Sequence, residues 1–347
     1  RHITEKERMR VWYNRTFSSV NAAIKLIREA DTEGRFTIIH SNANRHAPAA
    51  RLAHEFHVEP TGLKGDAYVD WCLAFCRDQK IDIFVPGREA TLLAAEHARF
   101  ADVKTRVLSA APPAQLKRIH DKADFYAATV LPDAPVAAFR PFETLAQFDA
   151  AYAELRPQHA KLCVKPAHGI YGLGFAVVDE ERSSAALLIK GVEYHIGYQD
   201  LRRGLGELET FNTMLLMEFL DGPEYSVDCV GDHGRLVTGV VRRKLPQAGS
   251  GQLIDMRQDI VDATTRLCAD YQLNGVFNVQ FREGGGRPRL LEINPRMSGG
   301  IGMACLAGPN LPYIALRGFA EGYDGLEIPA PRHGMRVAEV SVATELA

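Results

Sequence analysis

The chain has 347 residues, of which 46% are hydrophobic and 24% are charged. That length exceeds one compact core, so we expect two or three domains. The 41 basic and 43 acidic residues nearly balance, which argues against a nucleic-acid partner. No apolar run approaches 18 residues and no secretory segment is present, so the sequence predicts no membrane association. Six cysteines without a CxxC pair favour a reducing, cytoplasmic setting.

The first third alternates short apolar runs with amphipathic stretches. Residues 1–8 are polar and aperiodic, and we interpret them as a tag or a disordered terminus. The following segment, 9–118, is expected to form an α/β domain built on a parallel, doubly wound sheet. Its expected strands are 10–13, 36–40 and 81–85, and its expected helices are 20–30, 67–77 and 90–100. No glycine-rich dinucleotide fingerprint follows the first strand, so the polar loops 14–19 and 41–46 either hold part of a substrate or are plain turns.

After Pro112-Pro113 the pattern changes to strands joined by short turns, which indicates antiparallel sheets in an α+β fold. Expected strands cover 161–166, 175–179, 215–220, 224–230, 236–245, 276–282 and 289–294, with helices at 145–155 and 254–271. Cys72 and Cys76 lie one helical turn apart in an amphipathic stretch, and we expect buried thiols rather than a metal site.

The hairpin 276–294 carries the most informative polar residues. Residues alternate faces along a strand, so folding about Gly284–Gly286 is expected to set Gln280 near Glu292. A carboxylate with neighbouring amides suits a hard cation bound to phosphates. An arginine just beyond the hairpin suits a transferring phosphoryl group. The alternative interpretation of the same residues is a polar face of a hairpin exposed to solvent.

Two further segments fit the same chemistry. Lys165 ends a strand, and the glycine-rich loop 169–174 follows it, where backbone N–H groups could approach an anion closely. No Walker A pattern is present. The segment 215–228 joins an apolar strand, on which an adenine ring could lie, to a carboxylate placed for ribose hydroxyls. A glycine-rich turn and an ordinary hairpin are the alternatives.

Taken together and in this order, the three segments resemble the ATP-grasp family over about 121–325. The letters that carry the resemblance are the lysine-bearing strand with its glycine loop, MEFLDGPEYSVD, and NVQF…LLEINPRMSGG. The resemblance implies two lobes, 119–188 with the glycine loop and 189–347 with the metal and phosphate site. It also implies ATP and Mg²⁺ as cofactors, with Mn²⁺ as an alternative metal. The opening stretch 10–19 looks like ATP-grasp proteins found with bacterial tellurium-resistance-type stress gene clusters.

Residue roles follow from the resemblance, position by position. Binding of the nucleotide is implied for Lys122, Lys165, Gly169, Gly172, Gly174, Glu218, Phe219, Leu220 and Glu224. Metal binding is implied for Gln280, Glu292 and Asn294, and Arg296 matches the arginine that meets the γ-phosphate and the acyl-phosphate. Many relatives carry an acidic residue where Gln280 stands, which leaves the number of bound metal ions open.

Other residues near these motifs complete the expected site. Ser298 and Gly299 follow Arg296 and are expected to offer donors to a tetrahedral oxyanion. Arg242 and Lys244 share one face of a strand, which points either at phosphates or the substrate carboxylate, or at solvent.

The resulting hypothesis is a ligase that phosphorylates a carboxylate and transfers the acyl group to an amine. Its partners would be small-molecule carboxylates and amines. Pairing as a homodimer, frequent in the family, stays an open option. The alternatives are bicarbonate or carbamate phosphorylation of the carbamoyl-phosphate-synthetase type, which the glutamine at position 280 favours, and a non-catalytic ATP-binding regulatory protein.

Overall fold

The computed structural model describes residues 3–4, 7–169, 172–247 and 249–346. The chain forms two compact units whose sequences interleave. The first unit comprises Arg1–Lys117, Pro223–Gln280 and Ile293–Ala347, and the second comprises Arg118–Gly222 and Phe281–Glu292. The predicted lobes 119–188 and 189–347 are different segments from these units and stay a prediction. Residues 1–2 and 5–6 of the expected terminal segment lie outside the described residues.

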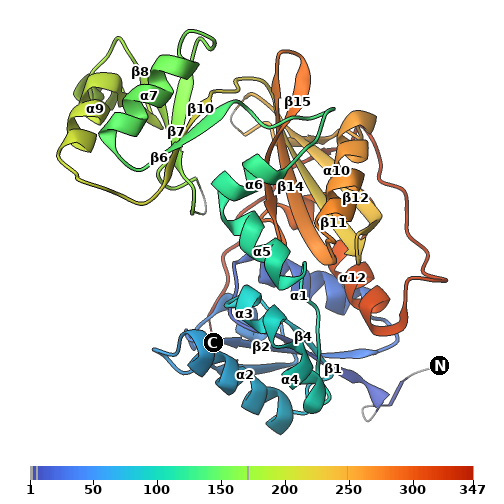
Figure 1. Cartoon of the computed structure of the whole chain (residues 1–347). Coiled ribbons are helices and arrows are strands. Elements are labelled where there is room, and N and C mark those ends of the chain that lie inside the picture. The colour runs from blue at the N-terminus through green and yellow to red at the C-terminus, as the bar shows by residue number, and fades with distance from the viewer. Residues whose placement is uncertain (1–2, 5–6, 170–171, 248, 347) are drawn as a thin grey trace. The chain divides into compact units, whose positions relative to one another are not determined.

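A five-stranded parallel sheet in the first unit confirms the expected parallel, doubly wound sheet (Figure 1). Its order is β3-β2-β1-β4-β5, and all four neighbouring pairs are parallel. The strands are β1 Met9–Tyr13, β2 Phe36–Asn42, β3 Glu55–Val58, β4 Ile83–Val85 and β5 Arg106–Val107. The helical segments between them are α1 Ser19–Ala30, the 3₁₀ helix η2 Pro48–Arg51, α2 Gly65–Asp78, α3 Ala90–Ala95 and α4 His97–Asp102.

Alternation along β1 explains why helices cover both faces of this sheet. Val11 and Tyr13 point to a core that includes the apolar face of α1. Trp12 points to the opposite core, which includes the apolar face of α2. Cys72 and Cys76 of α2 are buried in this second core, which confirms that they are packed thiols.

The second unit contains a mixed five-stranded sheet of order β6-β10-β7-β8-β9. Three neighbouring pairs are antiparallel and the pair β8 and β9 is parallel. Its strands are β6 Phe139–Phe142, β7 Leu162–Pro166, β8 Ala176–Asp179, β9 His195–Gly197 and β10 Met214–Glu218. Its helices are α6 Lys122–Ala128, α7 Leu145–Leu155, α8 Ser184–Ile189 and α9 Tyr198–Gly206, while α5 Pro113–His120 spans the boundary between the units.

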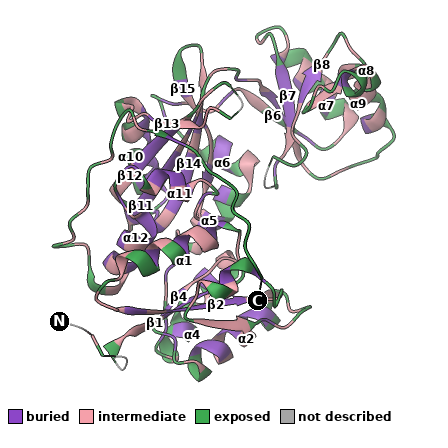
Figure 2. Cartoon of the chain, turned by 180° about the vertical axis from the view of Figure 1, so that it is seen from behind, coloured by how far each residue is buried: buried purple, intermediate pink, exposed green. Residues whose placement is uncertain are grey.

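A third sheet has the order β15-β14-β11-β12-β13-β16. Its strands are β11 Glu224–Asp232, β12 Arg235–Lys244, β13 Gln252–Ile254, β14 Gly275–Gly284, β15 Arg287–Asn294 and β16 Arg336–Val337. Helices α10 Gln258–Asp270, α11 Ile301–Cys305 and α12 Leu311–Glu321 belong to the same part of the chain, and buried and partly exposed residues mix along the strands (Figure 2). Gly285 and Gly286, both with positive φ, form the turn between β14 and β15, a backbone shape that favours glycine at both positions.

Two helix predictions are wrong in their bounds. The stretch 90–100 forms two helices, because the chain leaves the helical conformation at Glu96 (φ −101°, ψ 14°). The helix expected from Ile254 begins at Gln258, because Ile254 is fully buried in β13 and pairs with Arg242 of β12. None of the helices in the described part of the chain is long and apolar enough to cross a membrane.

Candidate active site

Two lysines of the second unit are held at the ends of neighbouring elements. Lys165 lies on β7, and its Nζ donates to the hydroxyl of Tyr126 at 2.6 Å. Lys122 opens α6, where the Asp121 carboxylate caps the helix by accepting from two backbone N–H groups. The backbone N–H of Lys122 donates to Ala167 O at 3.0 Å, which ties the start of α6 to the chain just after β7.

Both lysine side chains are shielded from solvent, which affects their pKa. Burial lowers the pKa of Lys165, and it also lowers the pKa of Lys122, where Glu292 opposes the shift. The Lys122 Nζ lies 3.7 Å from the Glu292 carboxylate and donates to Gly169 O at 3.1 Å. An anionic ligand would favour the charged form of both lysines, because it would replace the hydration that burial removes.

Tyr126 belongs to this cluster although the sequence analysis missed it. Its ring lies 5.0 Å from the Lys165 Nζ, and its hydroxyl donates to Leu291 O. Burial raises the pKa of Tyr126 well above its ordinary value, so the phenol stays neutral and keeps its proton. The spacing of four residues from Lys122 on one helix is the signal that could have found it.

The glycine loop after β7 is only partly described, because Ile170 and Tyr171 lie outside the described residues. Gly172 and Gly174 both have positive φ, at 66° and 81°. A Cβ on Gly169 or Gly174 would come within about 3.1 Å of the Pro166 ring. Glycine is therefore required on conformational grounds at two of the three predicted positions, and its role in binding phosphate stays a prediction.

The predicted hinge residues are anchored within the second unit. Glu218 ends β10, and its carboxylate accepts from Arg289 and from Ala138 N, both at 3.3 Å. The backbone N–H of Phe219 donates to Lys161 O at 3.0 Å, and its ring packs under Arg282. Leu220 is buried. These contacts fix the backbone of the segment, while contact with a nucleobase stays a prediction.

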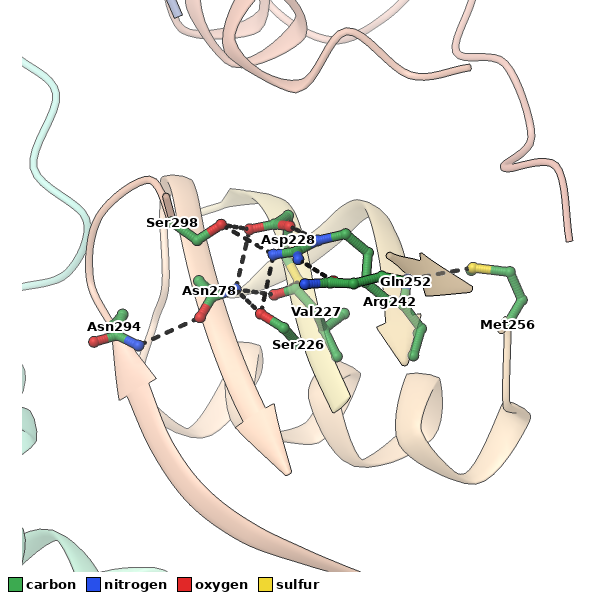
Figure 3. Close-up of polar contacts among 11 residues, drawn as sticks. Ser226, Val227, Asp228, Arg242, Gln252, Met256, Asn278, Asn294 and Ser298 are labelled. Carbon is green, nitrogen blue, oxygen red and sulfur yellow. Dashed lines mark hydrogen bonds and ion pairs between the residues drawn. The ribbon is translucent and has the colours of Figure 1, made fainter. Parts of the chain in front are cut away.

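In the first unit, a buried polar network surrounds Arg242 (Figure 3). Its guanidinium pairs with Asp228 at 2.8 Å, and the two side chains are 3% and 0% exposed. Further acceptors are the Ser226 and Ser298 hydroxyls, each at 3.2 Å, and the Gln252 side chain. Arg242 thus neither faces solvent nor offers a free side chain to phosphate, whereas Lys244 on the same strand is exposed.

This network reaches two of the predicted site residues. The Ser298 hydroxyl donates to Asp228, so it is engaged within the protein. Asn278 donates to Asp228 Oδ1 at 3.0 Å, and its own oxygen accepts from the Asn294 amide nitrogen at 3.3 Å. That bond uses the amide nitrogen of Asn294, and the role of this residue as a metal ligand stays a prediction.

The other metal candidates lie on the same two strands. Gln280 of β14 is partly exposed, and its neighbours Val279 and Phe281 are fully buried, as strand alternation predicts. Gln280 and Asn294 belong to the first unit and Glu292 belongs to the second. Glu224 opens β11 and is partly exposed.

Arg296 is oriented by a residue of the loop after β1. Its guanidinium carbon lies 4.2 Å from the centre of the Phe17 ring, and Nη1 donates to Met297 O at 3.1 Å. Gly299 is exposed, and Gly300 packs directly on the Arg242 guanidinium, which a Cβ would meet at 2.5 Å. The segment after Arg296 therefore packs against the buried polar network around Arg242.

Parts of this chain are similar in sequence to known proteins. Residues 210–343 match the family described as ATP-grasp in the biosynthetic pathway with Ter operon, a different segment from 10–19. Carnosine synthase 1 of Mus musculus is 39% identical over 100 residues, which cover 25% of this chain and 12% of that protein. The carbamoyl phosphate synthase large chain of Clostridium perfringens is 25% identical over 149 residues, 40% of this chain and 13% of that protein. The chain thus aligns with about an eighth of the length of these relatives.

Solved structures match over most of the chain. An ADP complex of N5-carboxyaminoimidazole ribonucleotide synthetase superposes with a TM-score of 0.64 at 14% identity, covering 90% of this chain and 76% of that one. The L-amino acid ligase from Bacillus licheniformis gives a TM-score of 0.60 at 14% identity, covering 92% and 75%. At this identity the likeness establishes the fold.

Proposed function

We propose that this chain, an ATP-grasp protein by the match of residues 210–343 and by its fold, is a ligase that uses ATP to join a carboxylate to an amine. The observation that carries the proposal is the cluster of Lys122, Lys165 and Tyr126 on adjoining elements, with Glu292 beside it. Two partly desolvated ammonium groups next to a carboxylate suit a metal-bound polyphosphate better than any neutral ligand. Carnosine synthase 1 and L-amino acid ligase, which this chain resembles, support the same reading.

In the proposed reaction a carboxylate oxygen attacks the γ-phosphorus of ATP, and ADP leaves. The amine nitrogen then attacks the acyl carbon, loses a proton, and phosphate leaves. Lys122 and Lys165 would hold the phosphates, and Arg296 would hold the carboxylate as it becomes an acyl-phosphate. The glycine loop 169–174 would exclude water from that intermediate, since water would hydrolyse it.

The predicted donor set consists of the Glu292 carboxylate and the amide oxygens of Gln280 and Asn294, and oxygen ligands of these kinds are the ones that Mg²⁺ takes. A magnesium ion bound there would neutralise charge on the ATP phosphates. Glu292 already lies beside Lys122, so its carboxylate is positioned in the unit that holds both lysines.

A second candidate reaction is phosphorylation of bicarbonate or carbamate. The 149-residue similarity to the carbamoyl phosphate synthase large chain, together with an amide rather than an acid at Gln280, favours it. It differs from the first in needing no organic carboxylate.

The test is phosphate release from Mg-ATP in the presence of pooled carboxylates and amines. We expect release to need one acid and one amine, and to fall by at least about tenfold in Lys165→Ala, since a charge-assisted contact contributes roughly 1.5–3 kcal/mol. Lys161→Ala, an exposed lysine on the same segment, is the matched control and should behave as wild type. Release with bicarbonate alone would favour the second reaction. Absence of ATP binding would refute both.

A further inference from the structure

The first unit contains a pocket at the carboxyl ends of β1 and β4. Tyr13 and Val85, the last residues of these strands, line it together with Ala90, Leu316 and Arg296. The space between its walls is about 750 Å³, open mouth included.

The topology of the sheet favours a ligand at this place. Strands β1, β2 and β3 follow one another toward one edge, and β4 and β5 are added on the other side of β1. The direction of winding therefore reverses between β1 and β4. Open α/β sheets bind ligands in the crevice that such a reversal creates at the carboxyl ends of the strands.

The loops that form this wall are fixed before any ligand arrives. The Asn14 amide oxygen accepts from Gly87 N at 2.6 Å, and its nitrogen donates to the Tyr68 hydroxyl at 3.0 Å. The buried Glu59 carboxylate accepts from Arg15 N at 2.9 Å and from the Tyr68 hydroxyl. The loop after β1 and the loop after β4 are thus joined by hydrogen bonds of the Asn14 side chain.

Close packing reinforces this connection. Gly87 lies so close to Thr16 that a Cβ on the glycine would come within 2.3 Å of the threonine Cβ. Both residues line the pocket. Its shape is therefore set by the chain itself, which lowers the entropy cost of binding.

The described lining of the pocket carries positive charge but no negative charge. Among the lining residues that the structure describes, Arg296 carries the only charge, and none is aspartate or glutamate. The other polar groups are neutral: the hydroxyls of Tyr13, Thr16 and Ser19 and the amide of Asn274. Burial raises the pKa of Tyr13, so this phenol keeps its proton. The remaining side chains are apolar.

A ligand that fills such a pocket can place an anionic end at Arg296 and an apolar body against the rest of the lining. A second charge of either sign would be desolvated without a counterion, which costs free energy. An ammonium group would find no carboxylate on the lining, and a second carboxylate would find no second cation. A lining of this composition favours a ligand with a single negative charge over amino acids and dicarboxylates.

We propose that this pocket binds the carboxylate substrate, and that this substrate is a monocarboxylic acid with a compact apolar body and no cationic group inside the pocket. The inference rests on the proposed ligase function and deepens it. Arg296 is the anchor for the carboxylate, and the apolar wall selects the acyl chain.

The probe is 4-methylpentanoate, compared with leucine, which adds an ammonium group, and with glutarate, which replaces the apolar end by a carboxylate. Binding to the full chain is measured by saturation-transfer NMR without ATP. We expect 4-methylpentanoate to bind at least about tenfold more tightly than either comparison ligand. Equal affinity for leucine or glutarate, or no binding of 4-methylpentanoate, would overturn the proposal.

Two pocket variants locate the binding. Ala90→Phe fills the pocket from the start of α3 and should weaken 4-methylpentanoate about tenfold or more, as should Arg296→Gln. The matched control is Ala101→Phe, an exposed position of α4, which should bind as wild type. Unchanged affinity in Ala90→Phe would overturn the proposal.

A direct contact keeps the proposal testable where a variant folds poorly. Met297 lines the pocket, so its labelled methyl group should show an intermolecular nuclear Overhauser effect to the ligand methyl groups. The signal is assigned by its loss in Met297→Leu. Ligand contacts to other methionines without Met297 would place the ligand elsewhere and refute the assignment.

The binding and activity results together distinguish a failure of the pocket assignment from a failure of the proposed ligase function. Binding of 4-methylpentanoate at Met297 without ATP consumption by any carboxylate would support the pocket and refute the ligase function. ATP consumption that depends on a polar acid and is unaffected by Ala90→Phe would support the ligase and refute the pocket assignment.

Discussion

Replacing Asp228 by asparagine keeps the size of the side chain and removes its charge, which leaves the Arg242 guanidinium without its counterion. Both side chains are almost fully enclosed, at 0% and 3% exposure, and their atoms lie 2.8 Å apart. Losing one partner of such a pair costs about 3–5 kcal/mol, because the remaining charge stays buried and uncompensated. We expect the free energy of unfolding to fall by that amount.

The assay is urea unfolding followed by tryptophan fluorescence. The two tryptophans of the chain, Trp12 and Trp71, both lie in the first unit, which also holds the pair. The matched control is Asp232→Asn on the same strand, whose partner Arg235 lies 3.0 Å away. Those side chains are 34% and 59% exposed, so the loss should stay below about 1 kcal/mol.

A double variant separates charge from packing. Asp228→Leu with Arg242→Met removes both charges at once, and it should be less destabilised than either single change. Equal effects of Asp228→Asn and Asp232→Asn would refute the view that the buried pair holds this part of the sheet. A double variant whose loss equals the sum of the single losses would contradict the coupling between the two residues.

Three further predictions follow from other parts of the structure. Lys165→Met should raise the free energy of unfolding of the ligand-free protein at pH 7, because burial lowers the pKa of this lysine and its charged form is costly when folded. The gain should fade in urea titrations as the pH rises from the lowered pKa toward the ordinary value of 10.5, and a constant gain across that window would contradict the reasoning. Gly87→Ala should lower the free energy of unfolding by roughly 1–3 kcal/mol, because the added Cβ would clash with Thr16. Gly204→Ala lies on a helix with open space around it and should raise the free energy of unfolding by up to about 1 kcal/mol. Urea unfolding of both variants distinguishes the effect of packing from that of backbone entropy. Burial raises the pKa of every cysteine for which a shift is resolved. A chromogenic disulfide reagent at pH 8 should therefore modify the six thiols slowly in the native protein and all of them quickly in urea. A rapid reaction of the native protein would contradict this expectation.

Local periodicity predicted most of the elements. The helix 145–155 has the bounds expected from its sequence, and the strands around the glycine turn at 285–286 fall within a few residues of expectation. These elements depend on patterns of a few residues that the chain displays locally. The break at Glu96 escaped prediction because the apolar spacing continues across it.

Contacts between distant segments could not be read from the sequence. The pairing of Asp228 with Arg242 depends on the register between β11 and β12, in which Ser226 lies opposite Arg242. Arg242 was therefore expected at the surface or at a phosphate. The spacing from Lys122 places Tyr126 on the same face of α6, but its contact with Lys165 depends on the start of α6 being tied to the chain just after β7.

The central claim is that ATP activates a carboxylate as an acyl-phosphate. It is tested by incubating the protein with Mg-ATP, the carboxylate that gives phosphate release, and hydroxylamine in place of the amine. We predict a hydroxamate together with an equal amount of ADP, because hydroxylamine would attack the acyl carbon and release phosphate. A hydroxamate accompanied by AMP and pyrophosphate would contradict the account, since it would mean transfer of the adenylyl group instead.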